Sequence, residues 1–210
     1  MAIDIKILNL IFAYAFVLIL LALLQLKKIP EEKLLFTASI RMTLQLILTG
    51  YLLTYIFEIN NYWLTIFIVI VMEIFSIINI KNIVKRKFPK QMLKTITYSM
   101  LIGNITVLVF FLLVVIKPNP ILSPRYWIPL AGMIIGNAMT GMSIGVKTLL
   151  DSIEDNSHKI ITSLHLGAEP QEALKSISNK CFESAILPTL NSMIGMGIVF
   201  LPGMMTGQIL

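Results

Sequence analysis

The sequence is poor in charge, cysteine and histidine. Charged residues make up 13% of its 210 residues, whereas about a quarter is usual for a soluble domain. With Cys181 as its single cysteine, the chain can form neither an internal disulfide nor a metal site built from several cysteines. Its two histidines, His158 and His165, are spaced poorly for binding one metal ion. We therefore assign no metal ligands from the sequence.

Motifs for nucleotide hydrolysis and covalent catalysis are also missing. The sequence contains no G-x-x-x-x-G-K-[ST] phosphate loop, no H-E-x-x-H zinc motif and no G-x-S-x-G nucleophile motif. The fragment "GMSIGVKT" has the wrong spacing for a phosphate loop. We predict that the chain is not an enzyme and binds no cofactor by itself.

Long apolar blocks make up most of the chain, which is 57% hydrophobic. A transmembrane helix needs about 20 mainly apolar residues. Six blocks meet this need and predict an all-α, polytopic membrane helix bundle, a single domain over residues 1–210. The predicted spans are Ile7–Leu26, Leu34–Phe57, Trp63–Ile80, Ile96–Ile116, Tyr126–Leu149 and Leu187–Leu210.

The basic residues predict how the bundle is oriented. The loop "KNIVKRKFPKQMLK" is rich in Lys and Arg, and most other basic residues fall in loops on the same side of the predicted bundle. Basic loops face the cytoplasm, so the N-terminus is predicted outside. The net charge of +6 then reflects cytoplasmic loops next to lipid, and no nucleic acid partner is predicted.

A cytoplasmic arm is predicted between the fifth and sixth spans. Apolar residues at helical spacing from Val146 to Leu164 predict an amphipathic helix that continues out of the membrane. Gly167 suits the left-handed end of that helix, and Pro170 suits the first turn of a new, short one. Its apolar stripe is Leu174, Ile177, Cys181 and Ala185. The pattern fits either an interfacial helix among lipid headgroups or a docking element for a soluble partner.

Polar side chains within the spans are candidates for a translocation pathway or for packing, because buried charge in lipid is costly. Arg41 and Gln45 share one face of the second span. Glu73 is predicted near the inner end of the third, where it can pair with Arg41; alternatively, Arg41 reaches the inner headgroups. The further candidates for this pathway are Asn137, Met139, Asn191, Met193, Met196, Met204 and Met205. Asn104 adds another uncharged polar group at depth.

Small residues and methionines are concentrated in the last two spans. Glycines four apart allow helix backbones to approach closely in lipid. These helix-packing residues are Gly132, Gly136, Gly141, Gly145, Gly203 and Gly207. The methionines either fill gaps between helices or act as soft, weak cation contacts. Pro129, Pro188 and Pro202 predict bends or breaks in these spans.

With these residues identified, the chain resembles the permease subunits of Fet-type iron-export ABC transporters, the FetB family, whose relatives include plant aluminium-tolerance permeases. The resemblance lies in "IRMTLQLILTGYLLTYIF", "IPLAGMIIGNAMTG", "LGAEPQEA" and "LPTLNSMIGMGIVFLPGMMTGQIL". It covers the chain from about Leu34 onward. Family members usually have a seventh span, so the end at Leu210 predicts a naturally shortened or a truncated permease domain.

The resemblance implies a cell-membrane permease, in the plasma or inner membrane, that exports iron or a related metal. It implies a permease homodimer powered by a separate cytoplasmic ABC ATPase, which would bind the ATP and Mg²⁺. The coupling residues would be Leu166, Gly167, Ala168, Pro170, Glu172 and Ala173. Two other readings stay open: a permease for a lipid or a nucleotide-sugar, and a membrane scaffold or sensor whose arm docks a regulator.

Overall fold

The structure, a computed structural model, describes residues 7–59, 61–84 and 88–195, and all regular elements in these ranges are helices. This confirms the all-α prediction for the described part of the chain. The helices divide between two compact units, the first holding α1 and α2 and the second holding α3 to α7. Each unit is described by itself, and the prediction of one permease domain stays a prediction.

The first unit is a pair of helices, α1 (Ile7–Leu26) and α2 (Glu32–Ile59). The hydroxyl groups of Tyr14 and Thr43 form a hydrogen bond between them. After α1, Lys28 takes a left-handed conformation with φ 54°. The Ile29 N–H then donates to the carbonyl of Leu24, which caps the end of α1.

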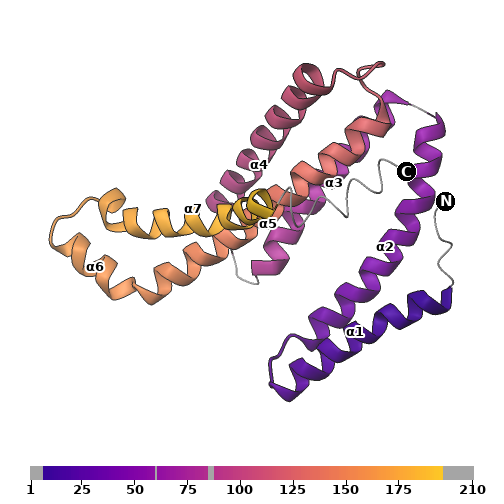
Figure 1. Cartoon of the computed structure of the whole chain (residues 1–210). Coiled ribbons are helices and arrows are strands. Elements are labelled where there is room, and N and C mark those ends of the chain that lie inside the picture. The colour runs from indigo at the N-terminus through magenta and orange to yellow at the C-terminus, as the bar shows by residue number, and fades with distance from the viewer. Residues whose placement is uncertain (1–6, 60, 85–87, 196–210) are drawn as a thin grey trace. The chain divides into compact units, whose positions relative to one another are not determined.

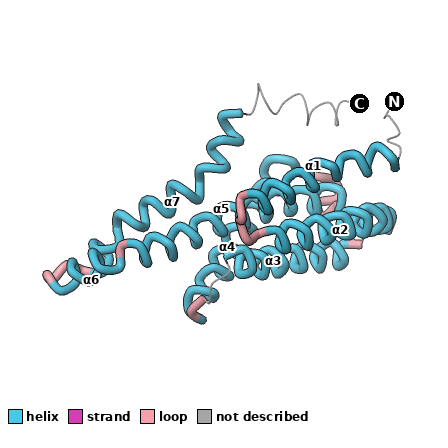
Figure 2. The backbone as a smooth tube through the Cα atoms, turned by 90° about the horizontal axis from the view of Figure 1, so that it is seen from below, coloured by secondary structure: helices cyan, strands magenta, loops and turns pink. Residues whose placement is uncertain are grey.

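The second unit is built around α5 (Pro124–Asp155), which contacts α3 (Tyr62–Val84), α4 (Lys90–Phe110) and α7 (Pro170–Gly195). The π-helical turn η1 (Phe111–Ile116) continues α4, and α6 (Ser157–His165) joins α5 to α7. After this connection α7 runs back alongside α5 (Figures 1 and 2).

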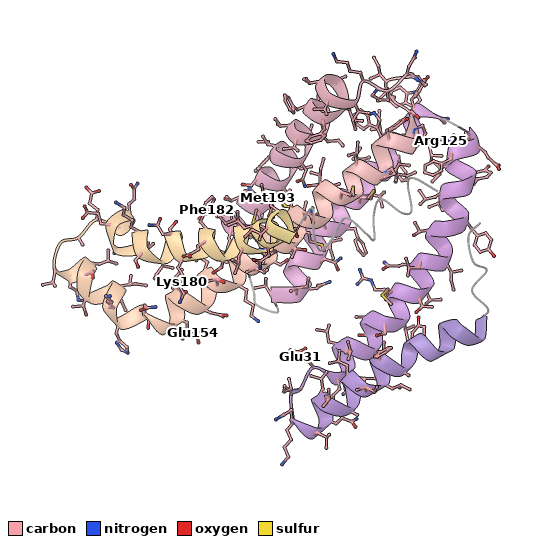
Figure 3. All side chains as sticks on the ribbon, in the orientation of Figure 1. Glu31, Arg125, Glu154, Lys180, Phe182 and Met193 are labelled. Carbon is pink, nitrogen blue, oxygen red and sulfur yellow. The ribbon has the colours of Figure 1, made fainter. Side chains whose placement is uncertain are left out.

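The length of α5 places one of its ends beyond any apolar layer that it spans. Its 32 residues extend over about 48 Å, whereas the hydrocarbon layer of a membrane is about 30 Å thick. Arg125 and Glu154 mark the opposite ends of this helix (Figure 3). The α6 end, which carries Glu154 and Asp155, extends away from α3 and α4 (Figure 1).

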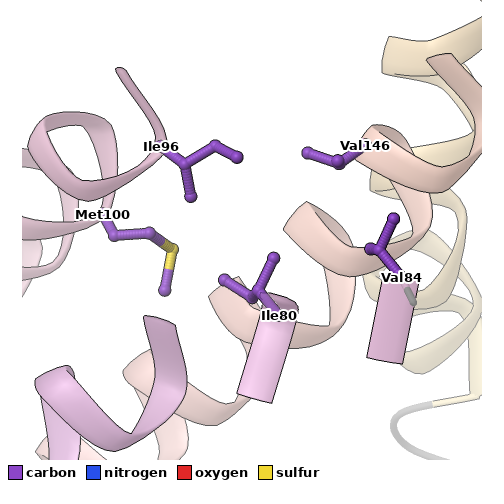
Figure 4. Close-up of a cluster of buried hydrophobic side chains, with 5 residues drawn as sticks. All are labelled: Ile80, Val84, Ile96, Met100 and Val146. Atoms are coloured by element: carbon purple, nitrogen blue, oxygen red, sulfur yellow. The ribbon is translucent and has the colours of Figure 1, made fainter. Parts of the chain in front are cut away.

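Two apolar clusters hold α3, α4 and α5 together. The first joins Ile80 and Val84 of α3 to Ile96 and Met100 of α4 and to Val146 of α5 (Figure 4). The second consists of Leu108, Leu112, Ala131 and Ile135 from α4, η1 and α5, and Val69 and Met72 of α3 pack against it. All side chains that form the two clusters themselves are less than 7% exposed, so the three helices form a close-packed group.

Within the described residues, four helical stretches are long and apolar enough to cross a membrane. They are α2, α3, α4 together with η1, and α5, which match the second to the fifth predicted spans. The first predicted span coincides with α1, whose stretch Tyr14–Leu26 is apolar but shorter. Residues 196–210, most of the sixth, lie outside the described residues. The six-span count and the orientation stay predictions.

The arm differs from its prediction in two ways. The helix predicted to run from Val146 to Leu164 is broken at Asn156, between α5 and α6, because the Asn156 side chain donates to the Ser152 carbonyl at 2.8 Å and ends α5. The helix that begins at Pro170 is not short, since it continues to Gly195. Neither Pro129 nor Pro188 interrupts its helix, and the short element is α6.

Candidate functional site

Two buried polar side chains meet between α3 and α4. The Asn104 amide donates to both carboxyl oxygens of Glu73, with Nδ2 at 3.1 Å from Oε1 and 3.0 Å from Oε2. Glu73 is 5% exposed and Asn104 is 7% exposed. The contact joins residues 31 positions apart in the sequence, so the packing of the two helices creates it.

Glu73 lies at the centre of α3. It is equally far from Tyr62 and Val84, the ends of the helix, at about 16 Å from each. The helix extends beyond Ile80, where the predicted span stops, and the prediction that Glu73 lies nearer the inner end of that span stays a prediction. The predicted pair with Arg41 stays a prediction, since Arg41 belongs to the other unit.

The spacing of buried residues along α4 and η1 explains why Asn104 meets a partner at this depth. The buried positions recur every four residues and form one stripe: Ile96, Met100, Asn104, Leu108 and Leu112. Asn104 is the polar member of this stripe, so it must lie between the two apolar clusters. Sequence reasoning noted the depth of Asn104 but missed its partner. This four-residue repeat is the signal that locates it.

A cavity of about 150 Å³ lies beside the pair, among α3, α4 and α5. Glu73, Asn104 and Thr97 are the polar residues of its lining, and the remainder is apolar. The Thr97 hydroxyl already donates to the Leu93 carbonyl at 2.9 Å. Ile74 and Ile105 line the cavity and are 53% and 54% exposed, so the cavity reaches the surface of this unit.

A negative charge on Glu73 is costly in apolar surroundings unless a positive charge balances it. A charge at the centre of a transmembrane helix costs about 2.5–3.5 kcal/mol on insertion scales. The Asn104 amide offers hydrogen bonds but carries no charge. In the described residues, no group of three or more His, Cys, Asp or Glu side chains could hold a metal ion.

Two of the predicted packing glycines lie where α5 and α7 approach most closely. A Cβ atom added at Gly141 would lie 2.9 Å from the carbonyl oxygen of Ala185, and one added at Gly145 would lie 3.0 Å from the Ala185 Cβ. At Gly132 the nearest atom is the Met72 Cε at 3.2 Å, and at Gly136 nothing lies within 4 Å. Close approach therefore requires glycine at Gly141 and Gly145.

The α7 face of this contact is the apolar stripe predicted from the sequence. Ile177 and Cys181 are buried, and Leu174 and Ala185 are half-buried. Burial raises the pKa of the Cys181 thiol, and the positive charge of Lys180 partly opposes this shift. The stripe thus packs against α5, which leaves the opposite side of α7 open.

The turn between α6 and α7 forms an exposed elbow, which we define as residues 166–173. Gly167 has φ +89°, and the Ala168 N–H donates to the Ser163 carbonyl at 3.0 Å, which gives the left-handed helix end that the sequence predicts. Pro170 begins α7, as predicted. Leu166 is 83% exposed, so the elbow presents a large apolar side chain on its surface.

The other predicted residues are spread over several surfaces. Met139 is half-buried and packs against the first apolar cluster, so it fills a gap between helices. Asn137, Asn191, Arg41 and Gln45 are exposed on their helices. Met193 is 64% exposed near the described end of α7 (Figure 3). The predictions for Met196, Pro202, Gly203, Met204, Met205 and Gly207 concern residues outside the described ranges.

Comparison with known proteins places the chain in a family. Residues 7–210 match the model of an uncharacterised protein family, UPF0014. The chain belongs to the UPF0014 family. It is 34% identical to the UPF0014 membrane protein slr1647 of Synechocystis over 190 residues, which cover 90% of this chain and 73% of the relative.

Two further relatives carry functional names. The chain is 29% identical over 199 residues to the "Probable iron export permease protein FetB" of Escherichia coli, which covers 94% of this chain and 75% of the relative. It is 33% identical over 184 residues to "Protein ALUMINUM SENSITIVE 3" of Arabidopsis thaliana, or 86% of this chain and 64% of the relative. No solved structure matches the chain. Relatives of this UPF0014 chain are named as membrane proteins, and four of its described helices are apolar and long enough to cross a membrane. Both observations support a multi-pass membrane protein.

Proposed function

We propose that this UPF0014 protein is the permease subunit of an ATP-driven transporter that exports a metal ion, works as a homodimer and is powered by a separate cytoplasmic ATPase. The permease assignment is supported by the similarity to FetB across 94% of this chain. The cargo, a metal ion such as iron, is taken from the name of that relative. A transporter subunit rather than an enzyme also agrees with the absence of catalytic motifs in the sequence.

The observation that carries the ATPase partnership is the elbow. It exposes Leu166 at the end of a helix pair whose backbones touch at Gly141 and Gly145. A partner that binds the elbow can therefore move α7 and α5 together, because closely packed helices move as a unit. An exposed leucine between two helix ends also suits an apolar pocket on a soluble partner.

The first experiment tests the elbow with a charge. We would co-purify the full chain with an ATPase subunit from the same genome and measure how strongly the permease stimulates ATP hydrolysis. Leu166→Glu should lower both binding and stimulation at least tenfold, because a charge would have to be buried in the partner. Ser178→Glu is the matched control, since it adds the same charge at an exposed position of α7 away from the elbow. If the two variants lowered ATPase binding and stimulation equally, the elbow would not be the docking site.

The second experiment tests the cargo. Vesicles containing the chain with the ATPase should take up iron, manganese, zinc or aluminium ions only when ATP is supplied on the ATPase side. Vesicles with the chain alone should show no such flux. Metal movement by the chain alone, at the same rate and without ATP, would contradict an ATP-driven permease. If ATP drove the uptake of none of the four ions, the assignment of a metal cargo would be wrong.

A further inference from the structure

We propose that Glu73 and Asn104 form a proton-binding site beside the cavity among α3, α4 and α5, in which the Glu73 carboxyl group carries a proton while no water enters the cavity. The proposal concerns the protonation of one side chain and needs neither a cargo nor an ATPase. It therefore goes beyond the proposed function and can be tested on the purified chain.

Among the described residues that line the cavity, none carries a positive charge that could balance an ionised Glu73. The cavity is lined by residues of α3, α4 and α5, and Glu73 is the titratable one among them. The other polar members of the lining, Asn104 and Thr97, are neutral. Along α4 the neighbouring titratable groups are Lys94 and Tyr98, which lie outside the lining, and Tyr98 is 63% exposed. On α3 and α5 the basic residues Lys81, Arg125 and Lys147 also lie outside it.

The amide of Asn104 is suited to both protonation states of a carboxyl group. An amide has two donor hydrogens and an acceptor oxygen. With Glu73 ionised, Nδ2 donates to both carboxyl oxygens, as the distances of 3.1 and 3.0 Å show. With Glu73 protonated, its O–H can donate to Asn104 Oδ1 while Nδ2 donates to the other carboxyl oxygen. A lysine or arginine at this place would instead fix the charged state.

The same residues make a poor site for a divalent metal ion. Zinc takes four ligands, and calcium takes six to eight oxygens. The cavity offers one carboxyl, one amide and one hydroxyl group, and the hydroxyl is already bonded to the Leu93 carbonyl. A proton needs a single oxygen atom. The ligand that fits the observed chemistry is therefore a proton.

The proposed step is the transfer of one proton between the Glu73 carboxyl group and water. When water enters the cavity, the O–H bond of the Glu73 carboxyl breaks, the electron pair stays on the carboxylate and the proton passes to water. When water leaves, the reverse reaction restores the neutral carboxyl. Ala131, Ile134 and Ile135 of α5 form part of the cavity wall. A movement of α5 that lets water into the cavity would therefore release the proton.

Infrared spectroscopy of the full chain in lipid nanodiscs tests the proposal. At neutral pH the wild-type protein should show the C=O band of a protonated carboxyl, shifted by exchange into D₂O. The band should be lost completely in Glu73→Gln, which keeps the size of the side chain and can form the hydrogen bonds of the protonated carboxyl group, with one acceptor and one donor toward Asn104. It should persist in Glu183→Gln, which removes an exposed carboxyl of α7. In Asn104→Leu the band should remain but move to higher frequency, because the carbonyl loses its hydrogen-bond donor.

The outcomes separate the possible states of Glu73. If wild type showed no protonated-carboxyl band that Glu73→Gln lacks at any pH from about 5 to about 9, Glu73 would be ionised throughout and the proposal would be overturned. A carboxylate band that shifted on addition of Fe²⁺ or Mn²⁺, with no protonated band beforehand, would also overturn it in favour of a metal site. Should Glu73→Gln fail to fold, the frequency change in Asn104→Leu still decides, because an ionised Glu73 gives no band to move.

Discussion

Replacing Gly141 by alanine provides a strong test of the contact between α5 and α7. The added Cβ would lie 2.9 Å from the Ala185 carbonyl oxygen, about 0.5 Å inside ordinary contact at 3.4 Å. That oxygen belongs to the backbone of α7 and cannot rotate away, so the whole helix must move. Overpacking of this kind costs about 1–3 kcal/mol, whereas alanine in place of glycine gains about 0.5–1 kcal/mol in a helix. We expect Gly141→Ala to be neutral to destabilising by about 2.5 kcal/mol.

Gly136→Ala is the matched control on the same helix. Nothing lies within 4 Å of a Cβ at that position, so this variant keeps the helix gain without the overlap. The difference between the two variants isolates the contact and should be about 1–3 kcal/mol in the free energy of unfolding. Reversible unfolding in mixed lipid and detergent micelles, followed by tryptophan fluorescence, measures it. Equal stabilities would mean that α5 and α7 do not approach at Gly141.

A double-mutant cycle with Ala185 identifies which atom of α7 clashes with the Cβ added at Gly141 or Gly145. At Gly145 the added Cβ meets the Ala185 Cβ at 3.0 Å, so Ala185→Gly removes the clash and should relieve the cost of Gly145→Ala. At Gly141 the obstacle is the backbone oxygen, which Ala185→Gly leaves in place. The coupling energy should therefore be about 0.5–3 kcal/mol for the Gly145 pair and close to zero for the Gly141 pair. The reverse order would show that the helices are packed in another register.

Three further predictions address other parts of the chain. Asn104→Leu should lower the free energy of unfolding by about 1–3 kcal/mol because Glu73 loses its donor, and replacing both residues by leucine should recover most of this loss in the same unfolding assay. Burial raises the pKa of the Cys181 thiol, and the thiolate is the form that reacts. Alkylation of Cys181 at neutral pH should therefore be slower than alkylation of the exposed cysteine in the double variant Ser178→Cys, Cys181→Ser, and it should accelerate as the pH rises. Equal rates for the two cysteines would contradict the burial of Cys181. Gly167→Ala should destabilise by about 1 kcal/mol because its φ of +89° suits glycine, and unchanged stability would argue against this helix end.

The parts of the structure that follow from local chemistry could be predicted from the sequence. The apolar blocks located the second to fifth helices, because a run of about 20 apolar residues has few alternatives to a helix in lipid. The left-handed Gly167 just after α6 and the start of α7 at Pro170 also agree with prediction, since the conformations of glycine and proline are set by their own covalent structure.

The parts that depend on packing could not be predicted in this way. The sequence shows that Glu73 and Asn104 are polar residues in apolar helices, but only the register of α3 against α4 brings them together. The predicted pair of Glu73 and Arg41 rests on opposite charge and similar predicted depth, and it stays a prediction because Arg41 belongs to the other unit. Pro188 predicts a bend or a break, and α7 continues through it without a break although proline is unfavourable inside a helix.

The central position of α5 has a consequence for how this family can evolve. One side of the helix carries Ala131 and Ile135 against α3 and α4, and another carries Gly141 and Gly145 against α7. A mutation in one contact tilts the helix and disturbs the other, so tolerated changes should arise in compensating pairs. Lineages should therefore diverge fastest along the exposed strip of α5 that includes Asn137, which is open among the described residues of this unit.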